Sequence, residues 1–288
     1  MATGLSSFVD GYHHFMETKS DPRTKDWWLM SSPMPLILIL VTYNYFCTKA
    51  GPRWMKDRKP FNLKYTMMFY NVLQVVFSVW LVNEGLQAGW LRDYNYRCQP
   101  VDYSENPKAI RMANATWYYM ACKLVELLDT VFFVMRKKNN QVSYLHLWHH
   151  TLMPVCAWIG VKFLADSPPR IDQVLNPGFQ GEWQRHSMAG GHGTLLGVIN
   201  SFVHIIMYSY YLLAGLGPEV QKYLWWKKYI TTLQMVQFII VFLHSAQLLV
   251  YECNYPKFIV FLLGINALYF LYLFGMFYRK TYKAKKNV

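Results

Sequence analysis

Charged side chains are scarce in this sequence: Asp, Glu, Lys and Arg make up 16% of its 288 residues, against about 25% in a typical soluble domain. Its five cysteines are too few for a disulfide-dense secreted scaffold. The chain has no collagen repeat, and it is too apolar to be disordered. Hydrophobic residues reach 53% and aromatic residues 18%. These proportions fit an integral membrane protein.

Seven stretches are long and apolar enough to cross a membrane, which takes about 20 mainly apolar residues in a helix. They lie at 28–48, 62–83, 114–135, 142–164, 193–215, 229–250 and 257–278. We therefore expect an all-α protein with seven transmembrane helices, forming a single domain over residues 1–288. Residues 1–27 are polar and hold acids as well as bases, so they do not read as a cleavable signal peptide.

The basic residues indicate the orientation of the chain in the membrane. Lys and Arg concentrate at 49–64, at 136–138, at 222–228 and in the tail 279–288. Because cytoplasmic loops are enriched in Lys and Arg, we expect this tail in the cytosol and the N-terminus on the opposite side. The net charge of +13 then reflects topology, and no nucleic-acid partner is expected.

Features of the other loops and of the C-terminus point to the secretory pathway. Cys98 and Cys253 both fall in non-cytosolic loops, where a disulfide between them is expected. Lys285 and Lys286 stand fourth and third from the end, the placement of a retrieval signal for the endoplasmic reticulum. A short basic tail is also what topology alone would produce. The Pro-, Gly- and Gln-rich stretch 165–189 reads as a lumenal loop outside the catalytic machinery.

Three histidines lie on one face of the fourth expected span. His146, His149 and His150 are spaced i, i+3 and i+4, which aligns their imidazoles along the helix. Polar groups inside a span are costly, so by default they mark a functional site. A neutral imidazole can ligate iron or zinc, and it can also act as a nucleophile or proton carrier. The spacing alone leaves both kinds of chemistry open.

Polar residues recur at helical spacing in three further spans. In the third span, Lys123 and Glu126 can pair, and Asp129 follows one turn later. The stripes of the fifth and sixth spans comprise Asn200, His204, Met207, Tyr208, Tyr211, Thr231, Gln234, Gln237, His244 and Gln247. Any one stripe could simply join helices by hydrogen bonds. Four of them in one chain favour a shared site inside the bundle.

Together these motifs resemble the four signatures of animal very-long-chain fatty acid elongases. The matching segments are Lys123 to Phe133, His146 to His150, Asn200 to Tyr211 and Thr231 to Gln237, in the family's order. The resemblance implies a membrane enzyme of the endoplasmic reticulum with an intramembrane acyl-CoA tunnel. Such an enzyme condenses a long-chain acyl-CoA with malonyl-CoA to a 3-oxoacyl-CoA, releasing CO2 and CoA. The stretch 165–189 departs from the family, which usually has a short Gly-rich turn there.

The resemblance also implies cofactors, partners and residue roles. No metal and no bound cofactor are expected, while membrane lipid, other enzymes of the elongation cycle and a second copy of the chain are expected partners. His149 would carry the acyl group, His204 would act on the same centre, and Glu126 or Asp129 would orient the reactive imidazole. The expected substrate-binding residues are Asn200, Tyr208, Tyr211, Gln234 and Gln237, and for the phosphates of CoA Arg136, Lys137, Lys138, Lys227 and Lys228. The basic residues could also be topology anchors alone.

Two other classes of protein share parts of this pattern. A membrane di-iron desaturase or hydroxylase also carries a His-x-x-His-His box, but it needs further boxes that the chain lacks. A seven-span receptor or lipid-binding protein shares the expected topology, but the charged, histidine-rich interior argues against this class. Cys156, two turns after His149, is a rival nucleophile, although a small core residue is the simpler interpretation.

Overall fold

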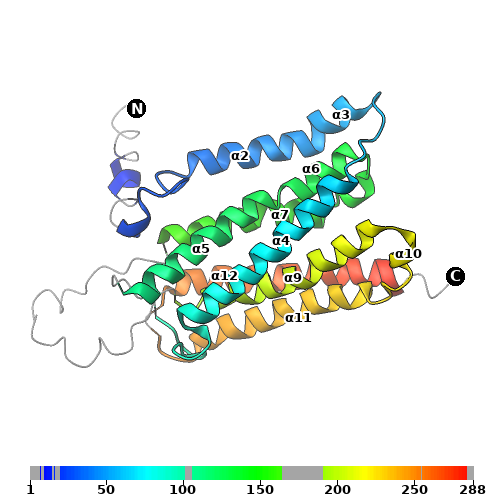
Figure 1. Ribbon diagram of the computed structural model, residues 1–288. Helices are drawn as coiled ribbons and strands as arrows, with labels where there is room; N and C mark the ends of the chain where they lie inside the picture. The colour runs from blue at the N-terminus through cyan, green and yellow to red at the C-terminus, as the bar shows by residue number, and fades with distance from the viewer. Residues whose placement is uncertain are drawn as a thin grey trace, which may run out of the picture.

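A computed structural model describes residues 7, 10–14, 16, 20–100, 106–163, 191–253 and 255–283. Within these ranges every regular element is helical (Figure 1). The long helices are α2 (Met34–Tyr45), α4 (Lys64–Gly85), α5 (Pro107–Val125), α7 (Tyr144–Phe163), α9 (Thr194–Leu216), α11 (Lys227–Ala246) and α12 (Lys257–Tyr278). The stretch 165–189 and the lysines Lys285 and Lys286 lie outside the described residues.

Six of the described helices form a closed ring. Helix α4 packs on α9, α9 on α11, α11 on α12, α12 on α7, α7 on α5, and α5 on α4. Helix α2 lies outside this ring and contacts α7 (Figure 1). The inward faces of the six helices therefore share one interior, and that interior holds the polar side chains.

Four described helices are long and apolar enough to cross a membrane: Lys64–Trp90, Thr194–Leu216, Lys227–Leu249 and Lys257–Tyr282. The expectation of an all-helical membrane protein is thus confirmed, while the count of seven spans stays a prediction. The other three expected spans also contain helices, namely α2, α5 with the short helix α6 (Leu128–Met135), and α7.

The third expected span differs from the structure at both its start and its middle. Its helix starts at Pro107 instead of 114, where the Asn106 side chain accepts a hydrogen bond from the backbone N–H of Lys108 at 3.0 Å. The helix then breaks at Glu126 and Leu127. The backbone N–H of Leu127 donates to the carbonyl of Leu124, and that of Asp129 to the carbonyl of Glu126, each three residues earlier. Glu126 and Asp129 consequently point to different partners.

The two ends of the bundle differ in chemistry. Near one end lie α3 (Gly51–Met55), α10 (Pro218–Gln221) and the end of α12 (Figure 1). We call this end the basic end, because the Lys and Arg clusters at 49–64, 136–138 and 222–228 belong to it. At the opposite end, which we call the disulfide end, Cys98 and Cys253 form the expected disulfide.

Two histidines close the disulfide end. Nε2 of His192 donates to the backbone oxygen of His244 at 2.6 Å, and Nε2 of His244 donates back to that of His192 at 3.1 Å. Their rings stack with centroids 3.5 Å apart. Burial lowers the pKa of His192 below its ordinary value, which favours the neutral ring. The reciprocal bonds connect the residues before α9 to the end of α11.

Candidate functional site

A buried ion pair occupies the interior of the ring. Lys123 donates to both carboxylate oxygens of Glu126, at 2.8 and 3.0 Å, and the two side chains are 2% and 3% exposed. The ammonium nitrogen also lies 4.7 Å from the centre of the Tyr119 ring. Each charge would be costly alone in this environment, so each depends on the other.

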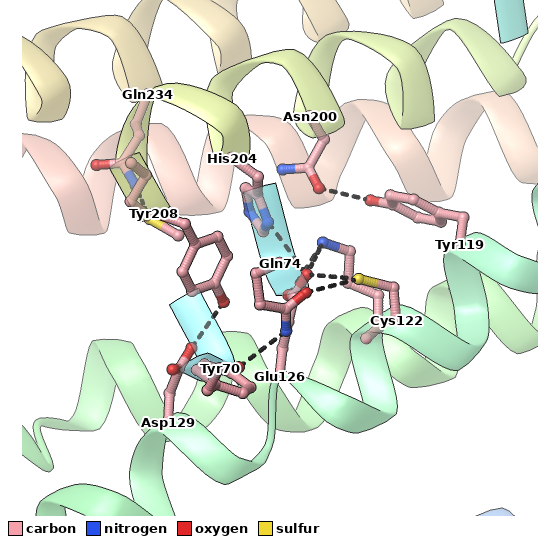
Figure 2. A network of polar contacts seen from close by, with 12 residues as sticks. Tyr70, Gln74, Tyr119, Cys122, Glu126, Asp129, Asn200, His204, Tyr208 and Gln234 are labelled. Carbon is pink, nitrogen blue, oxygen red and sulfur yellow. Dashed lines mark hydrogen bonds and ion pairs between the residues drawn. The ribbon is translucent and has the colours of Figure 1, made fainter. Parts of the chain in front are cut away.

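A histidine from α9 completes this group (Figure 2). Nδ1 of His204 lies 3.1 Å from Oε1 of Glu126. A carboxylate only accepts, so the proton is on Nδ1, and Nε2 of the neutral ring keeps its lone pair. Glu126 was one of two candidates, with Asp129, to orient the acyl-bearing His149; in the structure Glu126 instead contacts His204. The reason is that the last turn of α5 faces α9.

The second carboxylate of the motif has a different partner. Tyr208, which is fully buried, donates from its hydroxyl to Oδ2 of Asp129 at 2.8 Å (Figure 2). Asp129 therefore does not orient a box histidine in this structure either. Because the helix breaks between Glu126 and Asp129, the two carboxylates contact different residues of α9.

Polar side chains of α4 extend the network (Figure 2). Gln74 donates from its amide to the hydroxyl of Tyr70 at 2.9 Å and accepts from the Cys122 thiol at 3.3 Å. That thiol is also 3.5 Å from Oε1 of Glu126. The sequence analysis assigned no role to Tyr70 or Cys122. Their spacing was the available signal, since each stands four residues before a polar partner on its own helix.

The expected substrate-binding residues of α9 and α11 differ in their hydrogen bonds and in their burial. Asn200 accepts a hydrogen bond from the hydroxyl of Tyr119 at 2.9 Å, and Tyr119 is another residue that the sequence analysis missed. The amide nitrogen of Gln234 lies 3.6 Å from the sulfur of Met207. Gln237 is buried, and its side-chain oxygen has no hydrogen-bond partner in the described structure. Tyr211, in contrast, is 42% exposed.

The three histidines of α7 are neighbours, as their spacing predicted. The ring centroid of His150 lies 4.3 Å from that of His146 and 5.7 Å from that of His149. His149 also packs edge-on against Phe270 of α12, with centroids 4.8 Å apart.

His149 differs from His146, whose Nε2 lies 2.9 Å from the Thr130 hydroxyl, in its hydrogen bonding. Its Nδ1 is enclosed by protein and has no hydrogen-bond partner among the described residues. Buried polar atoms without partners are rare and are often functional. The described hydrogen bonds and ring contacts do not join His149 to His204 directly. The interior therefore presents two separate imidazoles, one on α7 and one on α9.

An apolar cavity of about 80 Å³ begins one helical turn beyond these imidazoles. Met153, four residues after His149, and Ser201, three before His204, line its near end. Small residues line much of the remainder, among them Gly85, Ala115, Ala157, Gly160 and Gly197. Gly193 and Thr194 line it at the disulfide end. The cavity is thus suited to a narrow apolar group.

The expected phosphate-binding residues lie at the basic end. Arg136 is half-buried, with Nη1 3.1 Å from the sulfur of Met67, and Lys137 donates to the backbone oxygen of Lys56 at 2.9 Å. Those left exposed are Lys138, Lys227 and Lys228. Among the described residues, no three His, Cys, Asp or Glu side chains are grouped to hold a metal ion.

Comparison with known proteins identifies the family. The model of the ELO: GNS1/SUR4 family matches residues 28–177 and 182–288. A very long chain fatty acid elongase of Aedes aegypti is 50% identical over 284 residues, covering 98% of this chain and 73% of the relative. The chain belongs to the very long chain fatty acid elongase family.

Other members of the elongase family align over similar lengths. Elongase 7 of Drosophila melanogaster is 48% identical over 96% of this chain and 78% of its own length. Elongase 4 of Mus musculus is 40% identical over 100% of this chain and 84% of its own length. Family membership confirms the resemblance drawn from the motifs, and it sets aside the desaturase and receptor alternatives.

Proposed function

We propose that this protein is the condensing enzyme of fatty acid elongation, a 3-oxoacyl-CoA synthase. It joins a long-chain acyl-CoA with malonyl-CoA to give a 3-oxoacyl-CoA, CO2 and CoA. The observation that carries the proposal is the placement of two histidines one helical turn from residues that line an apolar cavity: His149, with an unpartnered nitrogen among the described residues, and His204, held by Glu126. The names of the relatives support fatty acid elongation.

The apolar cavity is the proposed site for the acyl chain, with the thioester near the two histidines. The lining of the cavity is almost entirely apolar. Each methylene of the acyl chain that moves there from water therefore contributes about 0.8 kcal/mol to binding. In this proposal the acyl chain extends from the histidines toward the disulfide end, within an intramembrane tunnel. Small residues such as Gly197 line this cavity and leave room for the acyl chain.

In the first half-reaction, Nε2 of His149 attacks the thioester carbonyl. The carbon–sulfur bond breaks, the acyl group remains on the imidazole as an acyl-imidazolium, and CoA leaves as a thiolate that takes up a proton originating from water. Nucleophilic attack through Nε2 requires the proton on Nδ1, which the protein encloses without an acceptor among the described residues. A water-excluding interior protects the acyl-imidazole from hydrolysis.

In the second half-reaction, malonyl-CoA loses CO2, and the electron pair of the broken carbon–carbon bond forms an enolate. The enolate carbon attacks the acyl carbonyl, and the His149 imidazole leaves as the 3-oxoacyl-CoA forms. His204 is the proposed acid–base partner: its available Nε2 takes up a proton from water and passes it to the CoA thiolate that departs in the first half-reaction. When His204 takes up a proton, the adjacent carboxylate of Glu126 stabilises the resulting charge.

The phosphates of CoA are proposed to bind at the basic end, which offers Arg136, Lys137, Lys138, Lys227 and Lys228. We place this end in the cytosol and the disulfide end in the lumen of the endoplasmic reticulum, with seven spans in total. Lys285 and Lys286 then serve as the retrieval signal. No bound cofactor takes part in the proposed chemistry.

The test is a single-turnover experiment on purified protein. Acyl-CoA alone is expected to release CoA, up to about one equivalent per site, and to leave an acylated peptide containing His149. His149→Ala should abolish this burst, and His204→Ala should reduce it strongly. Gln247→Ala, which alters only the disulfide end, is the matched control and should change it little.

Two results would contradict the proposal at different levels. If active enzyme shows neither a burst nor an acylated peptide, the histidines act as bases in a ternary complex with both substrates. If no acyl-CoA in a panel of chain lengths yields a 3-oxoacyl-CoA with malonyl-CoA, the proposed condensing activity is wrong.

A further inference from the structure

Helix α2 lies outside the ring, yet one of its side chains reaches the histidine box through a neighbour. The hydroxyl oxygen of Tyr43 is 2.6 Å from Oγ1 of Thr130. The same Oγ1 is 2.9 Å from Nε2 of His146. Tyr43 is 6% exposed and Thr130 is fully buried, so within this enclosed chain each proton must have a protein acceptor.

The direction of each hydrogen bond follows from this enclosure. Thr130 is the partner of the Tyr43 hydroxyl in the described structure. If that hydroxyl only accepted, its own proton would be buried without an acceptor, so Tyr43 donates. Thr130 thus accepts a hydrogen bond from Tyr43 and donates one from its own hydroxyl to Nε2 of His146. Nε2 must then be unprotonated.

We propose that Tyr43 is a positioning residue that fixes the tautomer of His146. With Nε2 accepting, the neutral ring carries its proton on Nδ1 and acts as an N–H donor. A donor held in place is what a developing oxyanion requires. This catalytic consequence rests on the proposed condensation, whereas the tautomer itself rests only on the hydrogen bonds.

A second polar contact between α2 and α7 holds Tyr43 at the level of the histidine box. The amide nitrogen of Asn44, the next residue of α2, donates to Oγ1 of Thr151 on α7 at 3.0 Å. Thr151 follows directly after His150. Helix α2 is therefore docked on α7 beside the histidines by hydrogen bonds, whose partners an apolar lipid environment cannot replace.

The tautomer is measured by nitrogen-15 NMR on histidine-labelled protein, with the His146 signal assigned by His146→Gln. Wild-type protein and Tyr45→Phe should show the Nδ1–H form. Tyr45 lies two residues further along α2 and is 59% exposed, which makes it a matched tyrosine control. In Tyr43→Phe the Thr130 hydroxyl can turn its proton to a backbone carbonyl one turn earlier in its own helix. Its oxygen then accepts from His146, so the Nε2–H form should appear.

Condensation rates test the consequence. Tyr43→Phe should lower kcat about fivefold and change KM for acyl-CoA less than about twofold, because one buried hydrogen bond is lost outside the substrate site. Thr130→Val should lower kcat about tenfold or more, and Thr130→Ser should retain it. The double variant Tyr43→Phe with Thr130→Val should be no slower than Thr130→Val alone, because Tyr43 acts through Thr130.

The outcomes separate this inference from the proposed function. If Tyr43→Phe keeps the Nδ1–H form, or if the effects of the two substitutions multiply, Tyr43 does not act through Thr130. The NMR measurement needs no substrate, so it decides the tautomer even if wild-type protein does not condense acyl-CoA. A normal tautomer together with slower condensation in Tyr43→Phe would likewise overturn the inference.

Discussion

Replacing Glu126 by Gln removes the charge on which two other side chains depend. The amide keeps the shape of the carboxylate, but the Lys123 ammonium, which is 2% exposed, loses its counter-ion. His204 loses its carboxylate acceptor at the same time. The substitution therefore combines a stability defect with a catalytic one, and the structure indicates how to separate them.

The structure also sets the expected magnitudes. Removing one partner of a buried ion pair costs about 3–5 kcal/mol, because the remaining charge stays buried and unpaired. Asp129→Asn is the matched comparison in the same motif. The Asn oxygen can still accept the hydrogen bond of Tyr208, so we expect a cost of about 1 kcal/mol there.

The assay is unfolding of purified protein in detergent, followed by tryptophan fluorescence, together with condensation activity. Glu126→Gln should be the least stable variant. The double variant Lys123→Met with Glu126→Gln removes both charges and should recover most of the lost stability. Its activity should stay low, because the amide oxygen can accept the Nδ1 proton of His204 but has no charge to stabilise the ring when it is protonated.

Two results would refute this reasoning. Equal stability of Glu126→Gln and Asp129→Asn would show that Lys123 does not depend on Glu126 for its charge. Full activity of the double variant would show that Glu126 is only the counter-ion of Lys123 and does not act by stabilising protonated His204.

Three further predictions follow from the cavity and the loops. Cys156→Ala should keep most activity, because the one polar contact of the thiol among the described residues is a long one, 3.9 Å from the amide nitrogen of Asn266; a folded but inactive variant would make Cys156 the nucleophile. Gly197→Ala should be tolerated, since an added Cβ lies 3.8 Å from the Tyr119 ring, whereas Gly197→Leu should shorten the accepted acyl chains in product chromatography. Deletion of 165–189 should leave condensation measurable, and complete loss in a folded deletion would contradict this.

Local signals in the sequence were sufficient for the class of protein and for most helix positions. The hydropathy of a stretch decides whether it can be a membrane helix, and no knowledge of its neighbours is needed. The Lys123–Glu126 pair was also predictable, because residues three apart on one helix meet. The start of α5 was missed because polar residues near Pro107 lower its hydropathy, although Asn106 before a proline was a visible helix-start signal.

The pairing of the acids could not be predicted, because it depends on contacts between helices. The break after Val125 directs Glu126 to His204 and Asp129 to Tyr208, and neither partner is fixed by spacing along the chain. The contact of Tyr43 with Thr130 likewise joins residues from two helices far apart in the sequence. The sequence by itself determined which residues are polar within the membrane. Only the packing of the helices decided which of these residues form hydrogen bonds with one another. A hydrogen bond requires donor and acceptor on separate helices to be placed to within a few tenths of an ångström.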